Sequence, residues 1–180
     1  MGTGNNKARR KNTKITTGKQ DGATRVVLYG PEGIGKTTLA GRFPQPLFMD
    51  IEGGTSKMDV ARFSVVNYAD AINAVYELQR DTQGYKTLVI DTADWMERLI
   101  AVKVCASKAK DNLIDIGYGN GAKLVTDEWG KFLDIISGMQ RANGMHVVFC
   151  AHSWSKKVRL PGETEAYDHY ELKMNSTSGP

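Results

Sequence analysis

The sequence contains few of the residues that build disulfide frameworks, zinc sites or membrane spans. Only two cysteines occur among its 180 residues, Cys105 in a helix-like run and Cys150 in an apolar, strand-like run. Neither lies in a spacing typical of zinc ligands, so we expect both to be small buried hydrophobic residues. No run of 18 apolar residues is present, and the N-terminus has no apolar signal-peptide segment. These absences favour a cytoplasmic protein with no membrane contact.

The basic charge of the chain is concentrated at its N-terminus. Residues 1–24 carry six Lys or Arg and one Asp, with many Gly, Asn and Thr and almost no large apolar side chains. Such a segment cannot bury enough surface to offset the entropy of ordering it, so we expect 1–24 to be a flexible basic tail. The composition fits either a tail that contacts nucleic-acid phosphates or a solvated leader.

The remaining sequence predicts one α/β domain over residues 25–174, with 175–180 as an unstructured end. Hydrophobic residues make up 41% of the chain, enough for one sizeable core. Short apolar runs alternate with helix-period segments, which is typical of a mostly parallel sheet flanked by helices. The expected strands are 25–29, 46–50, 62–66, 86–91 and 146–151, and the expected helices are 36–43, 69–81, 92–108 and 122–142.

The end of this domain has a different pattern. Residues 156–160 and 167–174 read as two strands joined by a turn at Pro161-Gly162, which predicts a C-terminal β-hairpin. In the last expected helix, apolar residues recur every three or four positions and form one core-facing stripe. The stripe consists of Val125, Trp129, Phe132, Ile136 and Met139.

A glycine-rich segment directly after the first expected strand carries the strongest functional information. It matches the phosphate-loop pattern G-x-x-x-x-G-K-[ST], in which backbone N–H groups surround the phosphates of a nucleotide. Lys36 is expected to reach the β and γ phosphates, and the Thr37 hydroxyl to ligate Mg²⁺ at a helix N-terminus. The expected nucleotide-binding residues are Gly30, Pro31, Glu32, Gly33, Ile34, Gly35, Lys36, Thr37 and Thr38.

Three further side chains follow expected strands at the sheet edge where open α/β sheets bind ligands. Asp91 ends an apolar strand, the position from which phosphate-loop enzymes place an acid beside the metal. Glu52, followed by two glycines, either orients an attacking water or is an ordinary surface carboxylate. His152 either hydrogen-bonds the γ-phosphate or is a structural histidine.

Taken together, several segments resemble the RecA-type ATPase core and, more narrowly, the phage-encoded minimal RecA-like ATP-binding proteins, some of them implicated in single-strand annealing and recombination. The resemblance covers about residues 25–174. It is carried by the phosphate loop with Phe43-Pro44, Asp50-x-Glu52-Gly53, Leu88-Val89-Ile90-Asp91-Thr92, Asp94-Trp95, Gly117-Tyr118-Gly119 and Val147-Val148-Phe149-Cys150-Ala151-His152.

The resemblance implies a fold, cofactors and roles for individual residues. The fold would be a RecA-like P-loop core, and the cofactors ATP and Mg²⁺. Glu52 would be the catalytic carboxylate and Asp91 the metal-side acid. His152 would be the γ-phosphate sensor, at a position where RecA has an amide. An imidazole there titrates near neutral pH and, when neutral, donates from one nitrogen only.

The resemblance also implies DNA contacts. A loop over 111–121, including Tyr118 and Gly119, falls where RecA-like proteins contact DNA, although a plain turn fits equally well. In the hairpin, a basic side chain could act on ATP held by a neighbouring subunit, or the strand face could simply be solvated. The candidates are Lys156, Lys157, Arg159 and Lys173, and the first three are also candidate DNA contacts.

The function expected from these features is Mg-dependent ATP hydrolysis coupled to single-stranded DNA binding in phage-type recombination or annealing. The expected partners are single-stranded DNA, further copies of the chain and a single-strand-binding protein. One alternative is an ATP-gated assembly module with little turnover. Another is a small-molecule or nucleoside kinase, which residues 110–121 disfavour because they contain no arginine for a phosphate-closing lid.

Overall fold

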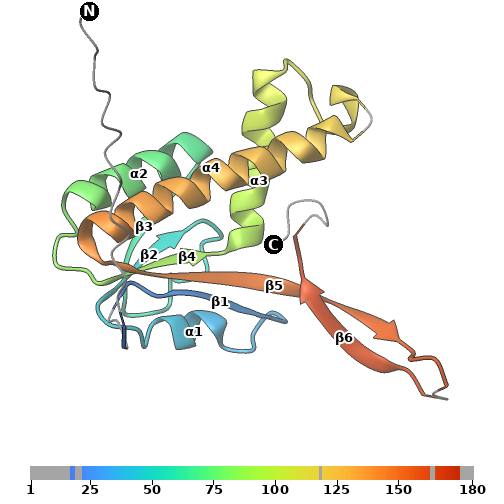
Figure 1. Ribbon diagram of the computed structural model, residues 1–180, viewed down its shortest axis with the longest axis horizontal. Helices are drawn as coiled ribbons and strands as arrows, with labels where there is room; N and C mark the ends of the chain where they lie inside the picture. Colours follow the sequence, from blue (N-terminus) through green and yellow to red (C-terminus); the bar gives the residue numbers. More distant parts are fainter. Residues whose placement is uncertain (1–16, 19–21, 118, 163–164, 175–180) are drawn as a thin grey trace, which may run out of the picture.

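The computed structural model describes residues 17–18, 22–117, 119–162 and 165–174, and places one sheet between two layers of helices (Figure 1). Its strands are β1 (Arg25–Gly30), β2 (Pro46–Asp50), β3 (Ala61–Ser64), β4 (Thr87–Asp91), β5 (His146–Val158) and β6 (Tyr167–Leu172). Its helices are α1 (Lys36–Ala40), α2 (Tyr68–Arg80), α3 (Ala93–Ser107), the 3-10 turn Ile114–Ile116 and α4 (Asn120–Asn143).

The sheet has the order β1-β5-β4-β2-β3, and all of these neighbours pair in parallel. Strand β5 therefore lies between the strand that leads into the phosphate loop and β4, the strand that ends at Asp91. Only β6 is antiparallel, and it pairs with the second half of β5. The predicted α/β architecture, a mostly parallel sheet flanked by helices with a C-terminal β-hairpin, is confirmed.

Helices cover both faces of the sheet, and the strand residues alternate between them. Helices α2, α3 and α4 lie over one face and α1 over the other (Figure 1). Leu88 and Ile90 of β4 join the larger core under α2–α4, whereas Val89 between them packs in the smaller core beside α1. All five residues of the predicted α4 stripe are buried in the larger core. The stripe is therefore core, as its period indicated.

Two boundaries differ from the sequence-based expectation by three residues or more. Strand β5 does not end at the sheet but continues to Val158, so the first hairpin strand and the last core strand form one element. The buried residues of β5 end at His152 and exposed residues follow from Trp154, a change of character that the sequence pattern indicated as a break. Helix α1 ends at Ala40, three residues earlier than expected, with Gly41 as its C-cap.

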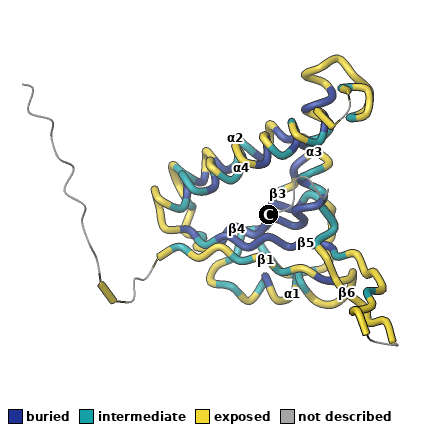
Figure 2. The backbone as a smooth tube through the Cα atoms, turned by 45° about the vertical axis from the view of Figure 1, so that its right-hand side comes forward, coloured by how far each residue is buried: buried dark blue, intermediate teal, exposed yellow. Residues whose placement is uncertain are grey.

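The hairpin and the far ends of α3 and α4 project from the core. Figure 2 shows that the buried backbone is concentrated in the central strands, whereas the hairpin is exposed along most of its length. No helix within the described ranges is both long and apolar enough to cross a membrane. Of the predicted basic tail, residues 1–16 and 19–21 lie outside the described residues, as does the predicted end, 175–180.

Candidate active site

The strand register brings the predicted functional segments to one edge of the sheet. Gly30 at the end of β1 pairs with His152 in β5, and Asp50 at the end of β2 pairs with Asp91 at the end of β4. Asp91 in turn pairs with Cys150, two residues before His152. The carboxyl ends of four neighbouring strands thus meet where open α/β sheets hold their ligands.

The phosphate loop joins β1 to α1 and contains two glycines with backbone angles that only glycine adopts readily. Gly33 has φ 75° and Gly35 has φ 98°, so a side chain at either position would strain the loop. The Lys36 ammonium donates hydrogen bonds to the carbonyl oxygens of Gly30 (3.0 Å) and Pro31 (2.8 Å). These bonds hold the charged end of Lys36 across the mouth of its own loop.

An open pocket of about 390 Å³ lies over this edge. Its lining includes nine of the predicted site residues: Glu32, Gly33, Gly35, Lys36, Thr37, Thr38, Glu52, Asp91 and His152. Three predicted loop residues, Gly30, Pro31 and Ile34, are not part of this lining, and Ile34 is 66% exposed. The lining also includes Gly54, Met58 and Thr92, which the sequence analysis had not assigned to a site.

Asp91 is a buried carboxylate among other charged groups. Burial raises its pKa above the ordinary value, and the nearby carboxylates of Asp50 and Glu52 raise it further. A hydrogen bond with the Thr37 side chain and the charge of Lys36 oppose this rise. The pocket thus concentrates negative charge beside the phosphate loop, an environment in which a cation is stabilised.

Glu52 is held at the pocket by the loop that follows β2. The N–H groups of Ile51 and Glu52 donate to the Asp91 carbonyl oxygen, at 2.9 and 3.4 Å. The buried Asp50 carboxylate accepts hydrogen bonds from the Gly53 N–H (2.7 Å), the Thr55 N–H (3.2 Å) and the Thr55 hydroxyl. Asp50 was noted in the sequence only as part of a motif, and its structural role is to shape the loop that carries Glu52.

His152 is buried and makes its main contacts with Asp94, in the first turn of α3. The Asp94 carboxylate accepts from the His152 backbone N–H (3.1 Å), and His152 Nδ1 lies 3.0 Å from Asp94 Oδ2. The other ring nitrogen, Nε2, lies 3.9 Å from Glu52 Oε2, and the ring lines the pocket. The sequence quoted Asp94 in a motif but assigned it no role, because the contact joins residues 58 positions apart.

The residues present fit a nucleotide with Mg²⁺ in this pocket. The described residues contain no group of three His, Cys, Asp or Glu side chains able to hold a metal by themselves. Mg²⁺ in phosphate-loop proteins needs no such group, because one or two side chains and the phosphates hold it together with water. Thr37 and Asp91, which both line the pocket, would supply those side chains. The buried Thr92 hydroxyl also lines the pocket.

The described members of the predicted DNA-contacting set do not line this pocket. Tyr118 falls outside the described residues, and Gly119 is the N-cap of α4. The predicted hairpin lysines are paired within their own ribbon: Lys156 with Glu171 (2.6 Å) and Lys157 with Asp168 (3.0 Å). Arg159 follows the end of β5 and is exposed.

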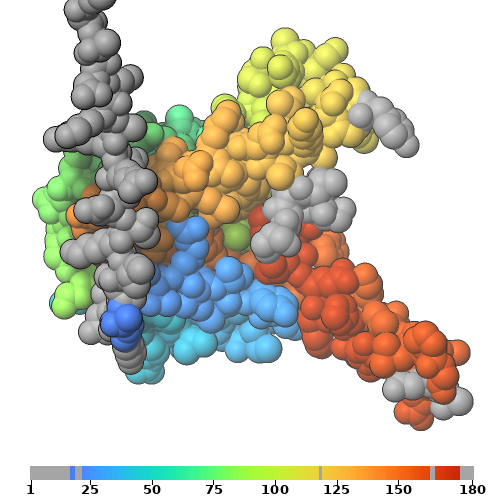
Figure 3. Space-filling view, viewed as in Figure 1, coloured from blue at the N-terminus to red at the C-terminus, as the bar shows by residue number. Residues whose placement is uncertain are grey.

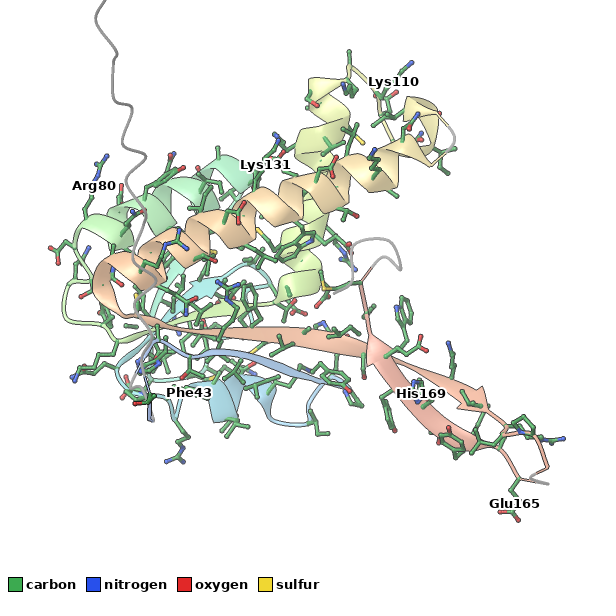
Figure 4. All side chains as sticks on the ribbon, in the orientation of Figure 1. Phe43, Arg80, Lys110, Lys131, Glu165 and His169 are labelled. Carbon is green, nitrogen blue, oxygen red and sulfur yellow. The ribbon has the colours of Figure 1, made fainter. Side chains whose placement is uncertain are left out.

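These residues belong to two projections of the molecule. Figure 3 shows the hairpin and the far ends of α3 and α4 as separate extensions of one face. Lys110 lies at the end of the helical projection and Glu165 near the tip of the hairpin (Figure 4). Within the described residues, neither the loop nor the hairpin contributes to the lining of the pocket.

The comparison with protein families matches residues 23–180 to the family described as "AAA domain". The chain belongs to this family. It is also 24% identical, over 139 residues, to the SPbeta prophage-derived uncharacterized protein YorG of Bacillus subtilis (strain 168). That match covers 73% of this chain but 42% of YorG, so the chain spans less than half of this relative.

Among solved structures, the chain matches one described as the crystal structure of the RadB recombinase. The match has a TM-score of 0.41 and 15% identity, and covers 74% of this chain and 63% of RadB. The family match agrees with the predicted phosphate-loop ATPase family, and the relative from a prophage agrees with the predicted resemblance to phage-encoded proteins.

Proposed function

We propose that this protein binds Mg·ATP at the carboxyl edge of its sheet and hydrolyses it. One observation carries the proposal: Lys36, Thr37, Asp91, Glu52 and His152, which come from separate segments of the chain, line a single pocket. This is the set of groups that phosphoryl transfer to water requires, namely a phosphate-binding ammonium, two side chains for a metal, a carboxylate for the water and a hydrogen-bonding sensor.

Each side chain has a role that its position supports. Bound Mg²⁺ would neutralise the charge of the phosphates, and Thr37 and Asp91 would hold it. Lys36 would exchange its bonds to the loop carbonyls for bonds to phosphate oxygens. Glu52, partly exposed and fixed to β4 through its backbone, would orient the attacking water and accept its proton. His152 would contact the γ-phosphate through Nε2.

We further propose that hydrolysis is coupled to single-stranded DNA, with the hairpin as the contact surface. On one face of the ribbon, alternate positions place Trp154 and Tyr167, 57% and 44% exposed, with Lys156 and His169 between them. Exposed aromatic rings next to cations form a stacking surface for bases. A two-stranded ribbon exposed on both faces is also marginal by itself, which favours a partner in the working assembly.

The test is phosphate release by the full chain with Mg·ATP, with and without single-stranded DNA, at several salt concentrations. We expect release to rise with DNA and the DNA effect to fall with salt. Light scattering in ATP and in ADP would show whether copies assemble with the nucleotide. Phosphate release that is unaffected by DNA at low salt would refute the coupling while leaving the ATPase proposal in place.

Two substitutions separate turnover from binding. Glu52→Gln should lower phosphate release by about 100-fold or more with ATP affinity kept, because the amide cannot accept the proton of water. A module that uses ATP only as an assembly switch would be insensitive to it. Lys36→Ala should abolish ATP binding, measured by equilibrium fluorescence, because no other described lysine lines the pocket. Unchanged affinity in this variant would place the nucleotide elsewhere.

A further inference from the structure

We propose that Asp94 is a positioning residue that fixes the proton of His152 on Nδ1, so that His152 contacts a γ-phosphate only as the imidazolium. ATP, in contrast to ADP, would then bind together with a proton. The inference rests on the proposed function, because it concerns the ring that would read the γ-phosphate. It assigns a role to Asp94 and a chemical form to His152 that neither the sequence pattern nor the family match gives.

The hydrogen bonds of Asp94 determine which nitrogen of His152 is protonated. A carboxylate only accepts, so the 3.0 Å contact between Asp94 Oδ2 and Nδ1 requires a hydrogen on Nδ1. Burial acts to raise the pKa of Asp94, but hydrogen bonds from His152, together with one from the Thr92 side chain, outweigh it and the pKa is lowered. Asp94 therefore remains ionised, and its second bond, from the His152 backbone N–H, fixes the carboxylate relative to the ring.

With Nδ1 protonated, neutral His152 presents a lone pair from Nε2 to the pocket. A lone pair repels both a phosphate oxygen and a carboxylate, and Nε2 stands 3.9 Å from Glu52 Oε2, beyond hydrogen-bonding distance. Only the imidazolium has a hydrogen on both nitrogens. A hydrogen bond from His152 to a γ-phosphate thus requires uptake of one proton, and ADP, which lacks that phosphate, does not require it.

Charged groups of both signs lie in the pocket with the ring. The carboxylates of Asp94 of α3 and Glu52 of the loop after β2 face its two nitrogens. The Lys36 ammonium of α1 lines the same pocket. The remaining charged residues of the pocket are Asp91 of β4 and Glu32 of the phosphate loop. The Lys173 backbone N–H donates to the His152 carbonyl oxygen, while its ammonium lies over the Trp154 ring. A γ-phosphate that arrives in the pocket would add negative charge beside Nε2, and this charge would favour a proton on that nitrogen.

The first test observes the tautomer directly and needs no nucleotide. Long-range ¹H–¹⁵N NMR distinguishes Nδ1–H from Nε2–H imidazole, and the His152→Gln variant identifies the signal among the three histidines of the chain. At a pH where the ring is neutral we expect the Nδ1–H pattern. An Nε2–H pattern would overturn the proposal whatever the protein does with ATP.

The second test measures proton uptake on binding. Calorimetry of the full chain with Mg·ATP and Mg·ADP, in buffers of different ionisation enthalpy, gives the protons bound per nucleotide. We expect up to one more proton for ATP than for ADP, and a preference for ATP over ADP that falls as the pH rises, by at most about tenfold per pH unit. His152→Gln, which donates without titrating, should bind with no extra proton and a flatter preference.

Asp94→Asn isolates the contribution of Asp94. The asparagine oxygen can still accept from Nδ1, but the negative charge beside the ring is lost, so the pH dependence should shift to lower pH. Asp81→Asn is the matched control, because Asp81 is exposed at the C-cap of α2 and should leave the profile unchanged. Far-UV circular dichroism would establish that Asp94→Asn is folded.

The outcomes separate this inference from the proposed function. Wild-type protein that binds and hydrolyses ATP with no proton uptake, or with an Asp94→Asn profile like that of Asp81→Asn, would overturn the role of Asp94 and leave the ATPase intact. Absence of nucleotide binding by the wild-type protein would overturn both. Extra uptake that disappears in His152→Gln and shifts in Asp94→Asn would establish the proposal.

Discussion

Replacing Asp50 with alanine should loosen the loop that carries Glu52, and the structure gives the size of the effect. The Asp50 carboxylate accepts hydrogen bonds from both the N–H and the hydroxyl of Thr55, a residue with 0% exposure. An unsatisfied buried donor costs about 1–3 kcal/mol. The bond to Gly53 adds little, because Gly53 is exposed and water can replace the carboxylate there. We therefore expect Asp50→Ala to lower the free energy of unfolding by about 2–5 kcal/mol.

The same substitution should impair catalysis more than nucleotide binding. Glu52 lies two residues after Asp50 in a loop that would lose its internal acceptor, whereas the phosphate loop is a separate segment. A displacement of about 1 Å of a group that positions a reactant can cost about 100-fold in rate. Phosphate release at saturating ATP should fall by up to about that factor, with ATP affinity changed far less.

Urea unfolding followed by tryptophan fluorescence measures the stability effect. Asp59→Ala is the control, because Asp59 is an exposed carboxylate in the same connection between β2 and β3 and should leave the unfolding free energy unchanged. A double-mutant cycle with Thr55→Val isolates the buried hydroxyl pair and should give a coupling of about 1 kcal/mol or more. A loss below about 1 kcal/mol for Asp50→Ala, with no coupling, would refute this account of the loop.

Two further predictions concern α4. Glu128 forms ion pairs with Lys103 and Lys131 that outweigh the effect of burial and lower its pKa. The contribution of Glu128 to stability is present above about pH 4.3 and is lost as the pH falls through its lowered pKa. Glu128→Gln should therefore destabilise the protein by about 1 kcal/mol at pH 7 and by less in acid, which thermal melts would measure. Gly121→Ala should destabilise the protein, because the added Cβ would lie 2.4 Å from a backbone oxygen. Gly130→Ala, whose Cβ would meet nothing within 4 Å, should stabilise it by about 0.5–1 kcal/mol in the same melts. Equal effects of the two alanines would contradict this packing.

Local sequence signals predicted most of the core. The strand before the phosphate loop, the strand ending at Asp91 and the α4 stripe each follow from a hydrophobic period that burial then enforces, and all three appear at the expected positions. The phosphate loop was recognisable because its glycine and lysine spacing is itself the chemical requirement. Gly35, a fixed glycine of this pattern, has a positive φ angle, and so does Gly33, which stands at a variable position.

The sequence did not reveal the contacts between strand ends. Asp50 and Asp94 were both visible as acidic residues near strand ends, but an Asp at such a position equally well faces solvent, binds a metal or caps a loop. Which of these holds depends on sheet order, and β5 lies between β1 and β4 although it comes last among the parallel strands. That order places His152 beside the first turn of α3, a contact that no local pattern encodes.

The hairpin was predicted correctly, but the environment of its lysines differs from the one expected. Its lysines were candidates for an exposed basic surface, yet Lys156 and Lys157 each form an ion pair across the ribbon. Exposed pairs of this kind are worth little in stability, but they cancel the field that would attract a phosphate backbone. If the ribbon contacts single-stranded DNA, stacking on Trp154 and Tyr167 must therefore supply much of the affinity. Trp154→Ala should then weaken DNA binding more than Lys157→Ala does. Salt titrations of both variants measure this, and equal losses with a reduced salt dependence for Lys157→Ala would assign the contact to charge instead.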